Sequence, residues 1–161
     1  MAAPKWLSGF LSKSQFESFF RSISTVAAEF DVLDLPAALW PNLYLLHVNP
    51  DGSLPIRIAG EGLRTVLSRD LRGQDLTDIM HGPSSDSVVR AYRTCVADAT
   101  SICLRRHVQI RSKGLIKVVE GAIAPLIEGD RVIKVAGCLF LYSLETVKAG
   151  ALGELYSVNP R

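Results

Sequence analysis

The sequence predicts an α+β domain with five strands in antiparallel pairs, several short helices and an amphipathic helix near the N-terminus. Three observations predict this class. Apolar residues recur at three- and four-residue steps early in the chain, and they alternate with polar residues in five later segments. The last three of these segments are joined by only a few turn-forming residues, and such short connections join antiparallel neighbours.

The first predicted element is an amphipathic helix over residues 12–30, which Ser12 or Ser14 can cap and which Leu35-Pro36 ends. Its stripe packs either on the sheet of its own domain or, because part of it is spaced as a short heptad seam, on a second subunit in a homodimer. The stripe consists of Phe16, Phe19, Phe20, Ile23, Val26, Ala27 and Phe30.

A hairpin and a group of helices are expected next. Residues 43–48 and 54–59 read as strands around the turn Asn49-Pro50-Asp51-Gly52. The elements that follow are a short helix at 63–67, helical turns around Gly73, a loop at 80–83 and a longer helix that begins at Ser84 or Ser85 and ends near Ala99.

Three long strands close the domain, over residues 100–111, 116–127 and 132–142. Both connections, at residues 112–114 and 128–130, are typical of tight turns. The predicted organisation is a flanking helix in residues 1–36, a core domain in residues 37–144 and a tail in residues 145–161.

One charged residue stands in the apolar phase of the first of these strands. A turn centred on Lys113 places Arg106 opposite Glu120 on an otherwise apolar face. An unpaired buried charge costs several kcal/mol, so the two are expected to pair. The pair either pins the register, or lets Arg106 hold a ligand carboxylate or phosphate while Glu120 positions it. A two-residue turn instead sets Glu120 opposite His107.

Other candidate ligand-binding residues are Tyr44 and Tyr92, which can stack on a planar ligand, and His81, which can line a cavity mouth. Core packing is the alternative role for the tyrosines, and a solvated loop is the alternative place for His81. The histidines lie on different elements without metal-ligand spacing, so no metal site is expected. The motifs of nucleophilic catalysis are also missing from the sequence, so the chain is expected not to be an enzyme.

Composition limits which binding partners and which cell compartment are expected for the protein. The 161 residues carry a formal net charge of +2, and no run of like charge exceeds two residues, so neither nucleic acid nor anionic lipid is expected as a partner. The three widely spaced cysteines and the lack of a secretory signal predict reduced thiols in the cytoplasm. No segment is apolar for long enough to span a membrane.

Two segments carry a family resemblance. LSRDLRGQDLTDIM resembles the PAS-domain segment in which a glycine, here Gly73, separates short helices. IAPLIEGDRVIKVAGCLFLYS resembles the closing hairpin of that family, with Pro125-Leu126 before the turn and Gly137 in the last strand. With the order of elements, residues 39–143 resemble the small proteobacterial PAS proteins that have no fused output domain.

The resemblance implies a five-stranded antiparallel sheet with short helices across one face and a ligand or cofactor between them. It does not imply a chromophore. The flavin-binding group has a reactive cysteine in an Asn-Cys-Arg-Phe-Leu type motif that this chain lacks, and the haem-binding group takes its ligand from the longer helix, where residues 85–99 contain no histidine. The cofactor is therefore left open.

The expected function is that of a non-enzymatic sensory or ligand-binding domain in signal transduction, which acts through a protein partner or a homodimer. Its ligand is expected to be a small molecule, with an anion as the candidate that Arg106 suggests. One alternative is a protein-interaction or dimerisation module whose core is filled by side chains. A third is a small enzyme of the ketosteroid-isomerase kind with Glu120 as its base. Both phases of residues 132–142 are largely apolar, so both faces of the sheet need cover. The N-terminal helix or a partner subunit is expected to cover the face that the short helices leave open.

Overall fold

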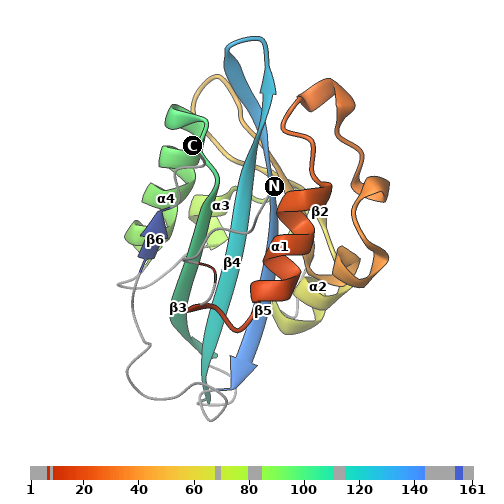
Figure 1. The fold of residues 1–161 in the computed structure, drawn as a ribbon. Coiled ribbons are helices and arrows are strands. Elements are labelled where there is room, and N and C mark those ends of the chain that lie inside the picture. The colour runs from red at the N-terminus through yellow and green to blue at the C-terminus, as the bar shows by residue number, and fades with distance from the viewer. Residues whose placement is uncertain are drawn as a thin grey trace.

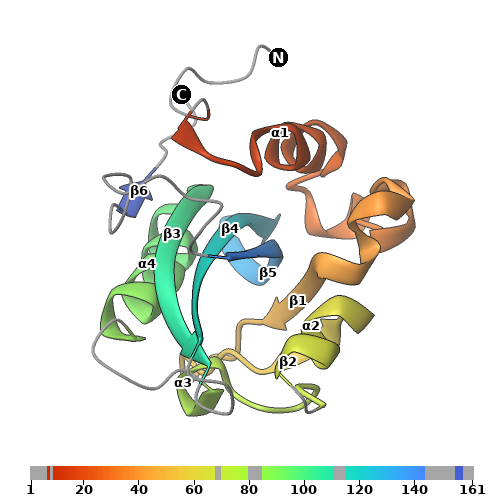
Figure 2. The same ribbon diagram turned by 90° about the horizontal axis from the view of Figure 1, so that it is seen from below.

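The protein is built around one antiparallel sheet with helices on both sides (Figures 1 and 2). A computed structural model describes residues 7, 9–67, 70–79, 85–110, 115–143 and 155–157. The strands lie in the order β2-β1-β5-β4-β3-β6. They are β1 (Leu43–His47), β2 (Ile56–Ala59), β3 (Ile102–Ile110), β4 (Leu115–Glu128), β5 (Arg131–Ser143) and β6 (Leu155–Ser157). The helices are α1 (Lys13–Ser22), η2 (Ala27–Glu29), η3 (Val32–Asp34), η4 (Ala37–Asn42), α2 (Glu61–Leu67), α3 (Leu76–Ile79) and α4 (Ser85–Asp98).

The five expected strands are present, and a sixth adds to them. The three residues of β6, in the predicted tail, pair with the outer edge of β3. At the opposite edge, the free side of β2 is partly paired by the turn before α3, since the N–H of Gly73 donates to the carbonyl of Ile56 and the N–H of Ile56 to that of Gln74. Both edges are thus partly protected from pairing with another chain.

The inner face of the sheet carries α2, α3 and α4 (Figure 2). Their apolar side chains pack with those of the strands into one core, which includes Leu46, Leu63, Leu76, Cys95 and Ile123. This is the face that the sequence assigns to the short helices.

The outer face carries the N-terminal segment, with α1 on the opposite side of the sheet from α4 (Figure 2). Phe16 and Phe19 are fully buried there. The sheet leaves room for these rings because its outward side chains are small, namely Cys103, Ala122, Ala124, Ala136 and Cys138. The chain's own helix therefore covers its own sheet, which was the first of the two expected arrangements.

The predicted helix over residues 12–30 is wrong in length, because α1 ends at Ser22. Ile23 is extended, and Val26 forms a parallel bridge with Ile127, whose N–H donates to the carbonyl of Thr25 over 2.7 Å. Serine, threonine and β-branched residues are weak helix formers, and here a strand-like contact with β4 replaces the helix. Val26 and Phe30 thus lie outside α1.

The register predicted for the closing strands is also wrong, by one residue in each hairpin. Ile110 lies opposite Leu115, so four residues separate β3 from β4, and Arg105 rather than Arg106 lies opposite Glu120. The expected turn at residues 112–114 lies outside the described residues. Between β4 and β5 the predicted two-residue turn at Gly129 and Asp130 is correct, but a bulge at Leu126/Ile127 shifts every later pair.

Candidate functional site

A polar group lies inside the otherwise apolar inner core. Tyr44 of β1 and Tyr92 of α4 are both buried, their ring centroids are 6.5 Å apart, and their hydroxyl oxygens share a short hydrogen bond. Arg106 of β3 is half-buried and interacts electrostatically with both tyrosines. The structure therefore brings together three of the five predicted ligand-binding residues.

Tyr44 can occupy this position because it faces a glycine. Gly137 of β5 lies directly opposite Tyr44 of β1, and a Cβ added to Gly137 would lie 2.7 Å from Cε2 of the Tyr44 ring. No side chain larger than hydrogen fits under the ring. The glycine on which the family resemblance partly rests therefore has a packing function here.

The protonation of this group follows from its burial. Burial raises the pKa of Tyr44 well above its usual value, and the neighbouring Tyr92 raises it further. Burial also raises the pKa of Tyr92. Burial lowers the pKa of Arg106, while the two tyrosines act in the opposite direction. Two neutral hydroxyls beside a guanidinium form a set of donors suited to a carboxylate or a phosphate.

A second polar group lies on the outer face and joins the sheet to the N-terminal segment. Arg105 and Glu120 form a buried ion pair, with Arg105 Nε 2.7 Å and Nη2 2.6 Å from Glu120 Oε2. The same guanidinium donates to the carbonyl of Gly9 and lies 5.1 Å from the centroid of the Phe10 ring. The pair thus lies beneath the residues that lead into α1.

Glu120 also caps α1 from the sheet. Its carboxylate accepts the N–H of Ser12 over 2.7 Å and that of Leu11 over 3.1 Å. Ser12 is at the predicted N-cap position, but its hydroxyl makes no capping bond and instead lies 2.7 Å from the Tyr142 hydroxyl. A carboxylate distant in sequence therefore accepts the N–H of the N-cap residue and that of the residue before it, while the predicted serine cap forms no bond to the helix.

The predicted pairing of Arg106 with Glu120 is wrong, because the two side chains lie on opposite faces of the sheet. Glu120 is fully buried and holds Arg105 and α1, so it does not face an inner cavity as the base of an isomerase-like enzyme would. If the connection after Ile110 is taken to be four residues long, the register of the two strands places Arg105 opposite Glu120. His81 lies outside the described residues.

The six predicted flank residues divide between burial and exposure. Phe16 and Phe19 are fully buried, and Val26 is 47% exposed. Phe20, Ile23 and Phe30 are partly buried against the outer core. Their role in a dimer stays a prediction.

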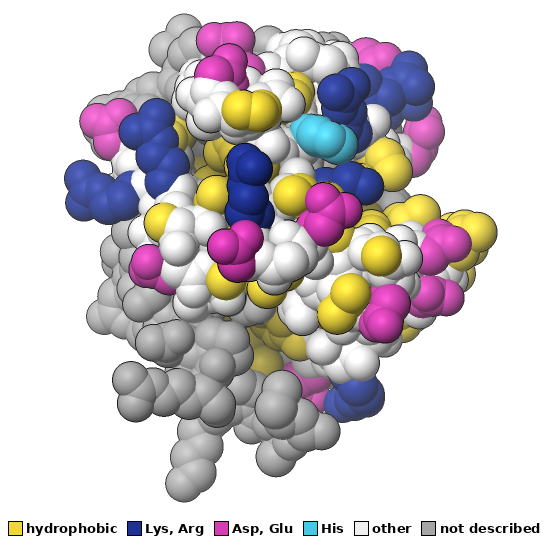
Figure 3. Space-filling view, turned by 90° about the horizontal axis from the view of Figure 1, so that it is seen from above, with side chains coloured by type: hydrophobic (Ala, Val, Ile, Leu, Met, Phe, Trp, Pro, Cys, Tyr) yellow, Lys and Arg dark blue, Asp and Glu magenta, His cyan; other side chains and the backbone are white. Residues whose placement is uncertain are grey.

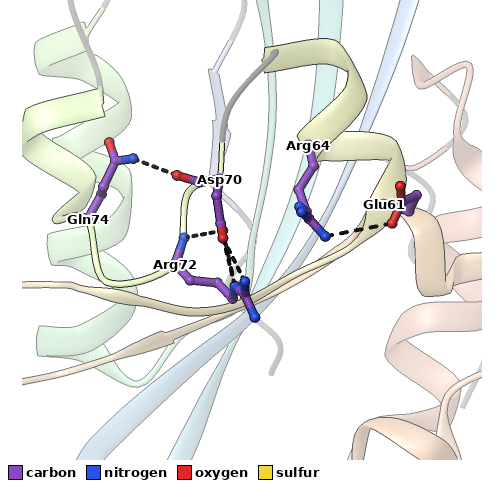
Figure 4. A network of polar contacts seen from close by, with 5 residues as sticks. All are labelled: Glu61, Arg64, Asp70, Arg72 and Gln74. Carbon is purple, nitrogen blue, oxygen red and sulfur yellow. Dashed lines mark hydrogen bonds and ion pairs between the residues drawn. The ribbon is translucent and has the colours of Figure 1, made fainter.

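Surface ion pairs surround the turn that contains Gly73 (Figure 4). Arg72 folds back on Asp70, with Nη2 and Oδ2 2.6 Å apart, and Gln74 donates to the Asp70 carbonyl over 2.7 Å. Arg64 pairs with Glu61 at 3.8 Å. Asp70, Arg72 and Gln74 shape the turn. Because both ion pairs are largely exposed, they contribute little to stability.

We expect Asp70 to titrate at about pH 2, mainly because the Arg72 side chain donates hydrogen bonds to its carboxylate and lowers its pKa from 3.8. Replacing Arg72 by glutamine should raise this pKa toward 3.8, whereas replacing Arg64, a more distant charge, should change it less. Carboxyl carbon NMR over acidic pH measures both. A pKa near 3.8 in the unaltered protein would contradict the turn geometry.

The described residues contain neither a metal-binding cluster nor a membrane span. No three His, Cys, Asp or Glu side chains among them come close enough to share a metal ion. None of their helices has the length and apolar character needed to cross a bilayer.

Comparison with known proteins gives the family. The family model described as PAS domain matches residues 28–140, which is more than half of the chain. The chain belongs to the PAS domain family. Among curated proteins no sequence match was found.

Solved structures share the PAS fold with this chain. A Light-Oxygen-Voltage domain studied with a flavin analogue is 20% identical, with a TM-score of 0.51 over 68% of this chain and 82% of that one. A fungal LOV domain photoreceptor is 18% identical, with a TM-score of 0.50 over 85% and 94%. A Rhodobacter sphaeroides LOV protein is 14% identical, with a TM-score of 0.51 over 86% and 70%. At these identities the likeness shows the fold alone.

Side chains are packed together on the described part of the inner face of this PAS domain. Drug-sized ligands occupy cavities of about 300–1,000 Å³, and here the Tyr44 and Tyr92 rings are packed between the sheet and α4. Cys95 is the cysteine of this inner core, and burial raises the pKa of its thiol to about 12. Such a thiol is inert rather than a reactive thiolate.

Proposed function

We propose that this PAS domain is a non-enzymatic sensory domain of the cytoplasm that binds a small anionic molecule and signals through a protein partner or a homodimer. The observation that carries the proposal is the placement of Arg106 beside the Tyr44 and Tyr92 hydroxyls in an apolar core. A ligand carboxylate or phosphate would accept hydrogen bonds from the guanidinium and replace the bond between the hydroxyls.

Signal transfer would follow β3. Arg105 and Arg106 are neighbours in this strand, so their side chains point to opposite faces of the sheet. A ligand that draws Arg106 toward itself shifts the backbone that also carries Arg105, and Arg105 is bound to Glu120 and to the carbonyl of Gly9. The N-terminal segment would then change its packing and present an altered surface to a partner.

One observation favours the alternative, a protein-interaction module without a ligand. The tyrosine hydroxyls satisfy each other, and the Tyr44 ring fills the space above Gly137. A core that is complete without a ligand needs none for stability. In that case the outer surface alone would provide the function.

Native mass spectrometry of freshly purified protein distinguishes the two functions. We expect a retained small molecule that is lost when Arg106 is replaced by glutamine and kept when Arg93, an exposed arginine of α4, is replaced in the same way. Removing a charged hydrogen bond of this kind costs about tenfold or more in affinity. No retained molecule, together with no thermal shift across a set of small carboxylates and phosphates, would favour the ligand-free module.

The same sample tests signal transfer. Ligand that saturates the protein should change hydrogen-exchange protection of residues 12–30 or the rate of subunit exchange. If it changes neither, the coupling through β3 is wrong even if the ligand binds.

A further inference from the structure

Three basic residues lie near one another at the end of β1. His47 of β1 lies directly opposite Lys134 of β5. Arg57 of β2 has no partner in β1, because Ile58 pairs with Leu45 and Ile56 pairs with Leu46. It is the extra residue of this irregularity. Figure 3 shows basic side chains beside a histidine on the molecule seen from above.

Arg57 and Lys134 are candidates for binding an anion. Within the described part of the chain, neither Arg57 nor Lys134 forms an ion pair. His47 has a buried Nδ1 atom without a hydrogen-bond partner among those residues. Burial lowers the pKa of His47, and the charges of Arg57 and Lys134 lower it further. The three groups are therefore close together.

An apolar hollow adjoins the basic group. Leu45, Ile58 and Ala136 line it, and each is one or two residues from His47, Arg57 or Lys134 in the same strand. Phe30, which follows η2, and Val32, the first residue of η3, line its other side. The hollow has a volume of about 10 Å³, room for about one water molecule, but its walls are apolar and so do not favour water.

We propose that this region is a binding site for a small amphipathic anion, a carboxylate with an alkyl chain. The carboxylate would lie against His47, Arg57 and Lys134, and the chain would enter the hollow. Phe30 is only partly buried, and Ile58 is 40% exposed. The alkyl chain therefore widens the hollow by displacing the Phe30 side chain outward and takes its place against Leu45 and Ala136.

Arg57 and Lys134 favour an alkyl carboxylate over a neutral lipid, because each side chain can make a charge-assisted hydrogen bond to a carboxylate. The apolar wall favours an alkyl carboxylate over an inorganic anion, because burying the alkyl chain removes apolar surface from water. Tyr44 and Gly137 also line the hollow, but Tyr44 belongs with Tyr92 to the inner core, whereas the proposed carboxylate site lies beside the outer core.

Titration of the full chain with decanoate below its micelle concentration, followed by amide NMR, tests the site. We expect shifts at His47, Leu45 and Ile58, and affinity about tenfold weaker after Lys134→Gln or Arg57→Gln. Arg131→Gln, an exposed change on the same hairpin, is the matched control and should leave affinity unchanged. Acetate and decanol, which lack the chain or the charge, should each bind at least about tenfold more weakly.

Several results would overturn the proposal. They are no decanoate binding, binding indifferent to both substitutions, equal binding of decanol, and binding to anionic lipid vesicles without binding of free decanoate. Arg106→Gln separates this site from the proposed inner ligand site. If that substitution abolishes decanoate binding and Lys134→Gln does not, the ligand binds inside the core and the outer site is wrong.

Discussion

Replacing Glu120 by alanine is expected to lower the free energy of unfolding by about 3–5 kcal/mol, the cost of breaking a buried ion pair. Arg105 is 5% exposed and would lose its carboxylate partner. The N–H groups of Leu11 and Ser12 would lose their acceptor at the same time. Urea denaturation measures the loss, and hydrogen exchange should show residues 9–22 released before the sheet.

Two further variants keep this result interpretable if the alanine variant does not fold. Glu120→Gln keeps an acceptor for the two amides while removing the charge, so it should cost less. The double change Arg105→Met with Glu120→Leu removes both charges and should recover much of the stability. If Glu120→Ala cost less than about 1 kcal/mol, the pair would not hold the N-terminal segment as described.

Gly137→Ala is expected to lower the free energy of unfolding by about 1–3 kcal/mol, the usual cost of overpacking a core. The new methyl group would meet the Tyr44 ring, which cannot turn aside because it is buried and bonded to Tyr92. The change should also disturb the ring resonances of both tyrosines. Thermal unfolding and aromatic NMR measure these effects.

Measuring Gly137→Ala in a Tyr44→Leu variant tests whether the Tyr44 ring causes the loss of stability. Leucine lacks the ring atoms that the methyl group would meet, so Gly137→Ala should cost less than about 1 kcal/mol there. Gly9→Ala is the matched control, since an added Cβ meets nothing within 4 Å, and it should stay within about 0.5 kcal/mol of the parent. Equal costs of Gly137→Ala in both backgrounds would show that the ring is not the obstacle.

Sequence periodicity was sufficient for the five main strands of the sheet, and the resemblance of two segments was sufficient for the family. Alternation and turn residues gave all five main strands to within two residues at each end, and Gly129 and Asp130 gave the β4 and β5 turn. Apolar patterning on both phases of the last strand indicated a sheet covered on both sides. These are local signals, because a side chain's phase depends only on its position along its own strand.

Sequence alone named Arg106, Tyr44 and Tyr92 as separate candidates for ligand binding, but it gave Glu120 the wrong partner. A shift of one residue reverses which pairs share a face, and here the length of one connection and one bulge set the register. The predicted length of α1 was wrong for a similar reason. The contact of Val26 with Ile127, which are distant in sequence, outweighed the periodic pattern. The sequence determined which residues are apolar, charged or turn-forming, and only the tertiary structure decided which distant ones meet, because pairing energies depend on separations that the chain's local pattern does not contain.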